Sequence, residues 1–399
     1  MKSLSSSVLA LAPSMTVAID TRAKELQAAG QDIVALGVGE PDFDTPEHIK
    51  DAAIASLREG KTKYTAPTGI PELKKAVSDK LLRENGVKIP ADQVVITSGV
   101  KHAVANVLQT LLNPGDEVVI PAPYWVTYPE LVKLYGGTPV FIPTSVDTGY
   151  KFTPEALEAA ITPRTKALIL CNPSNPTGMV YGKAELEAFA KILVKHDVYV
   201  LSDEIYEHIL YDGRKPVSIA SLGGGIADLT LIVNGVSKAY AMTGWRVGYF
   251  AGPAPIAKAI GALQSQATHH PANVSQYGAV AALNGGLELV QKMGQEFNRR
   301  REFVIESLRA IPGIKVAMPE GAFYALPEVS SFYGKKTPKG KVIGGSLDLC
   351  EYLLADELLA VVPGAAFGDD RCIRLSYATS MDVLGKALER LRRGLLALV

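Results

Sequence analysis

The segment T-L-I-V-N-G-V-S-K-A-Y-A-M-T-G-W-R-V-G-Y-F, residues 230–250, places one lysine between two short apolar runs. The runs at 230–233 and 247–250 are continuous and apolar, which predicts two buried strands. Lys238 and Arg246 are the only charged residues in this segment. Two interpretations of Lys238 are open. Either its amine reaches water from the end of a strand, or the amine is desolvated, has a lowered pKa and acts as a nucleophile.

Seven apolar runs of this kind occur in the first two thirds of the chain, and helical patterns separate most of them. They are residues 94–96, 118–120, 140–142, 167–170, 198–201, 231–233 and 247–250. Strands this apolar, with helices between them, predict an α/β fold whose mainly parallel, seven-stranded sheet is covered by helices. Ligands of such sheets bind where the strands end in loops.

The chain is expected to divide into three parts. Residues 1–45 would form an N-terminal arm and part of a small domain, residues 46–290 a large domain, and residues 291–399 a smaller α+β domain. Thr45 is expected to cap a helix that begins at Pro46.

The composition is that of a globular enzyme, with 47% hydrophobic and 21% charged residues. The 41 basic and 41 acidic residues give no net charge, so nothing indicates binding to nucleic acid or to an anionic membrane. Three cysteines without a close pair argue against disulfides and fit a cytoplasmic location. Three serines interrupt the short apolar stretch at the N-terminus, so it is expected to be an N-terminal arm and not a signal peptide. No apolar run is long enough for a membrane span.

Several common motifs are absent from the sequence. It has no G-x-x-x-x-G-K-[ST], H-E-x-x-H or G-x-S-x-G. Residues 223–225 lack the glycine spacing of a dinucleotide site, which argues against a nicotinamide-dependent dehydrogenase. The side chains of the adjacent His269 and His270 diverge, so we expect no metal site there.

Polar segments follow directly after four of the predicted strands. In one, T-S-G-V-K at residues 97–101 opens a helix, and the free N–H groups of such a helix start can bind phosphate. In another, two Asn-Pro bonds make a rigid turn that fixes the amide of Asn175. In a third, Asp203 and Tyr206 lie on one side of a turn, although Asp203 could equally cap a helix. The fourth contains Lys238.

Together these segments supply an amine, a carboxylate, a phenol, an amide, an arginine and a helix start. Pyridoxal 5′-phosphate requires such a set, because it binds a lysine covalently, pairs its ring nitrogen with an acid and needs a phosphate site. The sequence therefore predicts this cofactor.

Several motifs, in order along the chain, resemble those of class I and II aminotransferases, which are fold-type I pyridoxal-phosphate enzymes. They are N-P-S-N-P-T-G (172–178), S-D-E-I-Y (202–206) and S-K-A-Y-A-M-T-G-W-R-V-G-Y (237–249). Four more narrow the resemblance to the bacterial-type aspartate aminotransferase branch, which includes enzymes that transaminate prephenate to arogenate. These are G-E-P-D-F-D-T-P (39–46), K-Y-T-A-P-T-G-I-P-E-L (63–73), P-A-P-Y-W-V-T-Y-P-E (121–130) and R-L-S-Y-A-T-S (374–380). The resemblance extends from about Pro13 to the final helix.

The resemblance implies roles around the cofactor. Lys238 would bind it covalently and move the proton at the substrate Cα, and Asp203 would pair with the ring nitrogen. Tyr206 and Asn175 would hydrogen-bond the ring hydroxyl. Trp125 would stack on the ring, and the phosphate would be held by Gly99, Val100, Lys101, Arg246 and Ser237. The family often has a serine where this chain has Gly235, which would leave phosphate binding to the other donors.

The resemblance also implies contacts to the substrate. Arg374 would bind the α-carboxylate bidentately, although an interdomain salt bridge is open as its alternative. Gly39 would offer its backbone, and Trp125 and Asn175 would contact the substrate as well. Lys101 and Thr16 match residues that bind the side-chain carboxylate in members that use prephenate and in members that use mainly aspartate and glutamate.

The resemblance further implies a homodimer with shared active sites, in which Tyr64 reaches the phosphate of the neighbouring subunit. The expected activity is transamination between L-aspartate or L-glutamate and oxaloacetate or 2-oxoglutarate, with the conversion of prephenate to arogenate as a second activity. An aminotransferase of another specificity and a pyridoxal-phosphate β-lyase remain alternatives, because these enzymes share most cofactor residues. A non-catalytic regulator is disfavoured, since no DNA-binding domain precedes the fold.

Overall fold

The computed structural model describes residues 4–12 and 15–399, without the side chains of Thr16 and Asp20. Thr16 was expected to contact the substrate, and its side chain lies outside the described part of the chain.

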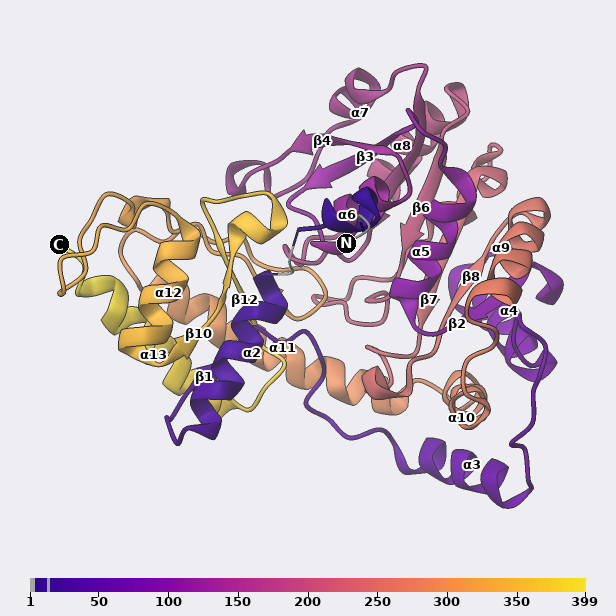
Figure 1. Cartoon of the computed structure of the whole chain (residues 1–399), viewed down its shortest axis with the longest axis horizontal. Coiled ribbons are helices and arrows are strands. Elements are labelled where there is room, and N and C mark those ends of the chain that lie inside the picture. Colours follow the sequence, from indigo (N-terminus) through magenta and orange to yellow (C-terminus); the bar gives the residue numbers. More distant parts are fainter. Residues whose placement is uncertain (1–3, 13–14) are drawn as a thin grey trace.

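The centre of the molecule is a sheet of seven strands in the order β2-β8-β7-β6-β5-β3-β4 (Figure 1). The strands are β2 (Val94–Thr97), β3 (Glu117–Ala122), β4 (Thr138–Pro143), β5 (Thr165–Cys171), β6 (Tyr199–Asp203), β7 (Thr230–Gly235) and β8 (Gly248–Ala251). β8 is antiparallel to both of its neighbours, and all other pairs are parallel. The predicted sheet is confirmed, and only Val198 and Val247 of the apolar runs lie just before their strands.

Both faces of this sheet are buried. Successive residues of a strand point to opposite sides of the sheet, and here they belong to two different apolar clusters. Val118 and Leu201 belong to one apolar cluster, whereas their neighbours Val119 and Val200 belong to another. The first cluster includes residues of α5 (Val100–Leu111) and α9 (Ala254–Ala267), and the second includes residues of α8 (Lys183–Lys195). The further helices around the sheet are α3 (Glu47–Arg58), α4 (Pro71–Asn85), α6 (Thr127–Leu134), α7 (Pro154–Ala160) and α10 (Asn273–Asn284).

A second group of elements lies beside the sheet. β1 (Val34–Ala35) pairs with β10 (Leu359–Ala360), and β12 (Ile373–Ser376) lies between β9 (Tyr324–Ala325) and β11 (Val362–Pro363). Their helices are α2 (Met15–Ala28), α12 (Ser346–Glu357) and α13 (Met381–Leu396), and α1 (Ser6–Leu9) contacts α6. The long α11 (Glu288–Arg309) reaches this group from the region of α10 (Figure 1). The division of the chain at residues 45 and 290 stays a prediction.

The start of α3 differs from the expectation, because the helix begins at Glu47 and Pro46 occupies the capping position. The Thr45 hydroxyl makes tertiary bonds instead. It donates to the carbonyl of Ala241 (2.6 Å) and accepts from Nε1 of Trp245 (3.0 Å). Thr45 thus fastens the segment that follows Gly39 to the loop after β7. None of the described helices is both long and apolar enough to cross a bilayer.

Candidate active site

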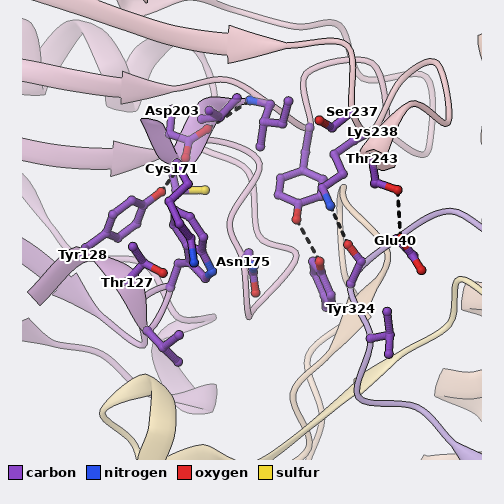
Figure 2. A pocket seen from close by; sticks show the side chains of 18 of the residues that line it. Glu40, Thr127, Tyr128, Cys171, Asn175, Asp203, Ser237, Lys238, Thr243 and Tyr324 are labelled. Atoms are coloured by element: carbon purple, nitrogen blue, oxygen red, sulfur yellow. Dashed lines mark hydrogen bonds between the residues drawn. The ribbon is translucent and has the colours of Figure 1, made fainter. Parts of the chain in front are cut away.

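A cavity of about 330 Å³ lies where the central strands end. Its walls include Cys171 from the end of β5, Asp203 from the end of β6 and Lys238 from the loop after β7 (Figure 2). Arg374 of β12 and Tyr324 of β9 close it from the smaller sheet. The cavity is therefore at the place where an open parallel sheet binds its ligands.

Most of the predicted site residues line this one cavity. They are Gly39, Val100, Lys101, Trp125, Asn175, Asp203, Tyr206, Ser237, Lys238, Arg246 and Arg374. Gly99 lies directly behind it, since a Cβ atom there would come within 2.3 Å of a guanidinium nitrogen of Arg246. Tyr64 is not among the lining residues; it is 89% exposed, and its ring packs against those of His269 and His270.

Lys238 has the environment of a desolvated amine, the second of the two interpretations. Its Nζ donates to the carbonyl of Gly39. Burial is the main reason why the pKa of Lys238 falls to about 8. The positive charges of Arg374 and Arg246 act in the same direction, and the carboxylate of Glu40 opposes them.

Asp203 is a buried carboxyl group with one fixed orientation. Its Oδ2 accepts from the hydroxyl of Tyr128 (2.7 Å), and its Oδ1 accepts from the backbone N–H of Ile205 (3.2 Å). Burial raises the pKa of Asp203 to about 6, and these two hydrogen bonds only partly oppose it. A positively charged group placed against this carboxylate would therefore favour its ionised form.

Arg374 is a buried cation, 3% exposed, whose guanidinium is held on several sides. It donates to Oδ1 of Asn175 (3.0 Å) and to the carbonyl of Gly37 (2.7 Å). It also lies 4.7 Å from the ring centroids of both Tyr324 and Phe367. Its Nε has no hydrogen-bond partner among the described residues. These partners are neutral, which argues against the salt-bridge alternative and leaves a positive charge available to an anion.

The other end of the cavity is also positive. Arg246 donates to the carbonyls of Thr243 (2.9 Å) and Ser98 (3.4 Å) beside the start of α5. The Nζ of Lys101 lies 5.2 Å from the ring of Trp125. Burial and the charge of Arg246 lower the pKa of Lys101. First-turn N–H groups and an arginine together make a site suited to phosphate.

Gly235, where the family often has serine, has no room for a side chain. A Cβ atom there would lie 2.7 Å from the carbonyl of Val247 and 2.9 Å from Cα of Gly248. A Cβ atom on Gly248 would lie 2.6 Å from the backbone of Gly99 and Val100. The backbones approach closely at the phosphate end, so a serine at position 235 would require them to shift.

Four titratable residues of the cavity lining were not among the predicted site residues. Tyr128 follows Trp125 by three positions and could have been found, since it shares the motif at 121–130 and this spacing fits one turn of a helix. Tyr324, whose hydroxyl hydrogen-bonds that of Tyr206 (2.8 Å), lies on a two-residue strand without a local signal. Cys171 and Glu40 also line the cavity, and Glu40 accepts from the hydroxyl of Thr243.

Comparisons with known proteins identify the class to which this site belongs. Residues 31–391 match the sequence model of the family "Aminotransferase class I and II". The chain therefore belongs to the class I and II aminotransferases, and it is a pyridoxal-phosphate-dependent aminotransferase.

Individual relatives match over nearly the full length. The aspartate/prephenate aminotransferase of Cereibacter sphaeroides is 48% identical, and 98% of each chain is covered. The aspartate aminotransferase of Bacillus subtilis is 45% identical with the same coverage. The crystal structure of the aspartate aminotransferase from Rhizobium meliloti superposes with a TM-score of 0.96 at 45% identity, and 100% of each chain is covered.

The residues around the cavity fit the cofactor of this family. Lys238 offers an amine of lowered pKa, and the buried Asp203 suits a ring nitrogen that carries a proton. Trp125 offers a flat face, and the start of α5 with Arg246 suits the phosphate. The Oδ1 of Asn175 accepts a hydrogen bond from Arg374, so its Nδ2 is available to donate to the ring oxygen.

The lowered pKa of Lys238 predicts how fast the cofactor-free protein captures pyridoxal phosphate. Only the neutral amine is a nucleophile, so the rate should rise with pH around a midpoint of about 8. Rapid mixing followed by cofactor absorbance measures this rate. A midpoint near 10 would contradict a desolvated amine. Lys238→Ala, as the control, should bind the cofactor without a covalent bond.

Arg374→Lys keeps the charge but loses the two-pronged geometry. We expect kcat/KM for every amino-acid substrate to fall by about 10- to 100-fold, the value of a charged hydrogen bond. The same change at Arg371, whose side chain is 47% exposed and paired with Asp369 (2.8 Å), is the matched control. Equal losses in both variants would show that Arg374 does not contact the substrate.

Proposed function

We propose that this aminotransferase exchanges the amino group of L-aspartate or L-glutamate with oxaloacetate or 2-oxoglutarate. The observation that supports this choice is a pair of cationic groups in one cavity. Arg374 on one wall would bind the α-carboxylate, and Lys101 on another would bind the side-chain carboxylate. Within the described part of the chain, the partners of both are neutral or cationic groups, and no carboxylate pairs with either charge.

In this proposal each residue around the cofactor has its own role in the transfer of the amino group. The cofactor ring, when bound, accepts the electron pair of the substrate Cα–H bond. Lys238 takes the Cα proton and returns it, since its lowered pKa lets the amine act as a base at neutral pH. Asp203 holds the proton on the ring nitrogen, Tyr206 donates to the ring oxygen, and Arg374 orients the substrate so that its Cα proton faces Lys238.

Prephenate is a second acceptor in this proposal. Relatives of almost equal similarity bear the names aspartate aminotransferase and aspartate/prephenate aminotransferase. Prephenate carries a side-chain carboxylate as oxaloacetate does, so Lys101 could bind either acid, together with Thr16.

The deciding experiment starts with enzyme that has taken up the amino group of L-aspartate and been separated from it. Its return to the original absorbance is followed after mixing with oxaloacetate or with prephenate. Comparable rates would support both acceptors, and return with oxaloacetate alone would limit the enzyme to dicarboxylates. Return with neither acid would overturn the aspartate proposal and leave the family membership intact.

Lys101→Ala should separate dicarboxylic from neutral substrates. We expect kcat/KM for aspartate, relative to alanine, to fall by about 10-fold or more, because one charged hydrogen bond is lost. Steady-state kinetics measures this ratio, and Lys133→Ala on exposed α6 surface is the control. An unchanged ratio would mean that Lys101 does not select the substrate.

The active enzyme in this proposal is a cytoplasmic homodimer. Tyr64 supports it, since its ring is 89% exposed and absent from the cavity of its own chain. An exposed aromatic residue on a family motif suits contact with a second copy, whose phosphate site it would reach. We expect analytical ultracentrifugation to give twice the mass of one chain, and a monomeric active species would contradict the shared site.

A further inference from the structure

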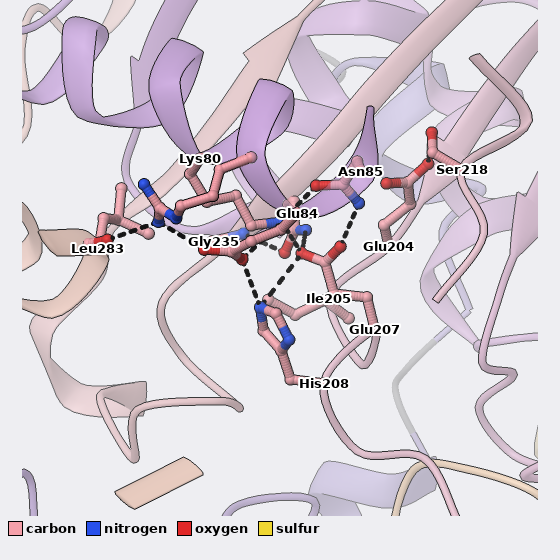
Figure 3. Close-up of polar contacts among 12 residues, drawn as sticks. Lys80, Glu84, Asn85, Glu204, Ile205, Glu207, His208, Ser218, Gly235 and Leu283 are labelled. Carbon is pink, nitrogen blue, oxygen red and sulfur yellow. Dashed lines mark hydrogen bonds and ion pairs between the residues drawn. The ribbon is translucent and has the colours of Figure 1, made fainter. Parts of the chain in front are cut away.

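Figure 3 shows a group of buried polar side chains that do not line the cavity. We call Lys80, Asn85, Glu207 and Asn234 the Glu207 cluster. Lys80 and Asn85 come from α4, Glu207 from the turn after β6, and Asn234 from β7. Lys80 is 2% exposed and Glu207 5%. Burial of such charges is unfavourable unless they are paired and hydrogen-bonded.

The carboxylate of Glu207 is fully engaged within the cluster. Its Oε1 accepts from Nζ of Lys80 and from Nδ2 of Asn234, and its Oε2 accepts from Nδ2 of Asn85. Lys80 also donates to Oδ1 of Asn85 (2.8 Å), which closes the ring of hydrogen bonds. One carboxylate therefore joins a helix to the ends of two central strands.

Glu207 is fixed to the cofactor-facing turn by the backbone. It directly follows Tyr206, and its N–H donates to the carbonyl of Glu204 (2.9 Å). The N–H of Glu204 in turn donates to the carbonyl of Val233 (3.0 Å) on β7. A shift of Glu207 would thus be transmitted to the turn that presents Asp203 and Tyr206.

The side chain of Asn234 connects Glu207 to the segment that carries Lys238. Asn234 donates to Glu207 through Nδ2, while its Oδ1 accepts from the N–H of Gly235 (2.7 Å). Gly235 ends β7 and begins the short stretch that leads to Lys238. The two segments that hold the reacting groups therefore meet at one buried carboxylate.

A second carboxylate on the same turn shows that this arrangement is specific to Glu207. Glu204 is equally buried, but its Oε1 accepts from the hydroxyls of Ser202 and Ser218, and its Oε2 has no partner among the described residues. The cation and both amides are thus concentrated on Glu207. The other ionisable groups nearby are Glu84, His208, Tyr240 and Tyr249.

We propose that Glu207, held by Lys80, is a positioning residue of the aminotransferase that sets Asp203 and Tyr206 relative to Lys238. This inference rests on the proposed roles of those three residues at the cofactor. Glu207 itself touches neither cofactor nor substrate.

The test is Glu207→Gln in the cofactor-loaded enzyme. The variant keeps the side-chain size but removes the nearest counter-ion of Lys80, which leaves Glu84 at 3.7 Å. Because glutamine has a single carbonyl oxygen, either Asn85 or Asn234 also loses its acceptor. We expect kcat to fall by about 10- to 100-fold, since misplacement of reacting groups has that effect. We also expect the pH titration of the lysine–cofactor linkage, followed by absorbance, to shift upward, because Tyr206 would stabilise the deprotonated form less well.

The direction of this shift separates positioning from a through-space effect. Removal of a negative charge alone would disfavour the protonated linkage and move its midpoint downward. A downward shift, or an unchanged midpoint with wild-type kcat, would overturn the proposal. Glu117→Gln is the matched control, because Glu117 is 6% exposed and bonded to Arg164 at the far end of β3. It should lower the melting temperature and leave the titration unchanged.

Two further variants keep the test decisive if Glu207→Gln folds poorly. Asn234→Ala leaves the Lys80–Glu207 pair intact and removes the link to Gly235, so it should give a smaller upward shift. Lys80→Met combined with Glu207→Met removes both charges and should recover stability. If that double variant also recovers wild-type kcat and midpoint, the cluster only stabilises the fold, and the proposal is wrong.

The wild-type enzyme distinguishes this inference from the proposed function. Absence of a covalent lysine–cofactor bond, or of turnover with aspartate, in the wild type would count against the proposed function. An active wild type with an unaffected Glu207→Gln variant would count against the positioning role alone.

Discussion

Arg374 is a cation buried among neutral groups that come from every part of the chain. Gly37 precedes the large sheet, Asn175 follows β5, and Tyr324 and Phe367 belong to the smaller group of elements. Hydrogen bonds and aromatic rings partly offset the cost of removing the guanidinium from water, but they carry no negative charge. The protein tolerates this burial only because the elements around it are fixed, and the same fixation builds the cavity. An anion that enters the cavity would therefore relieve an unfavourable interaction already present in the free protein.

Burial shifts the pKa values of Lys238 and Asp203 in opposite directions, and both shifts favour the neutral form. It lowers the pKa of the amine and raises that of the carboxyl group, so both are brought closer to their neutral forms. A neutral amine is what covalent capture of the cofactor requires. The carboxyl group is suited to a partner that brings its own positive charge. The free site is thus prepared for binding by desolvation as well as by geometry.

The sequence predicted the central sheet because its strands are short, continuous apolar runs, and it predicted the main cavity residues because they follow those strands. Tertiary contacts account for what it missed. Thr45 has the pattern of a helix cap, yet Trp245, 200 residues away, engages its hydroxyl. Tyr324 reaches the cavity from a strand of two residues. Glu207 is one glutamate among many until Lys80, 127 positions earlier, is placed against it. The predicted role of Tyr64 depends on a second chain.

The three close-packed glycines at the phosphate end have an evolutionary consequence. The backbone is tightly packed at three glycines. Gly235 and Gly248 lie against other backbone atoms, and Gly99 lies against the guanidinium of Arg246, so a methyl group at any of them would collide with its surroundings. These three positions cannot take a side chain without a shift of their surroundings. Sequence change that alters which acids are accepted is therefore expected at other walls, around Val38 and Val126, whose side chains line the cavity. Cofactor recognition and substrate choice can then evolve at different speeds within one cavity.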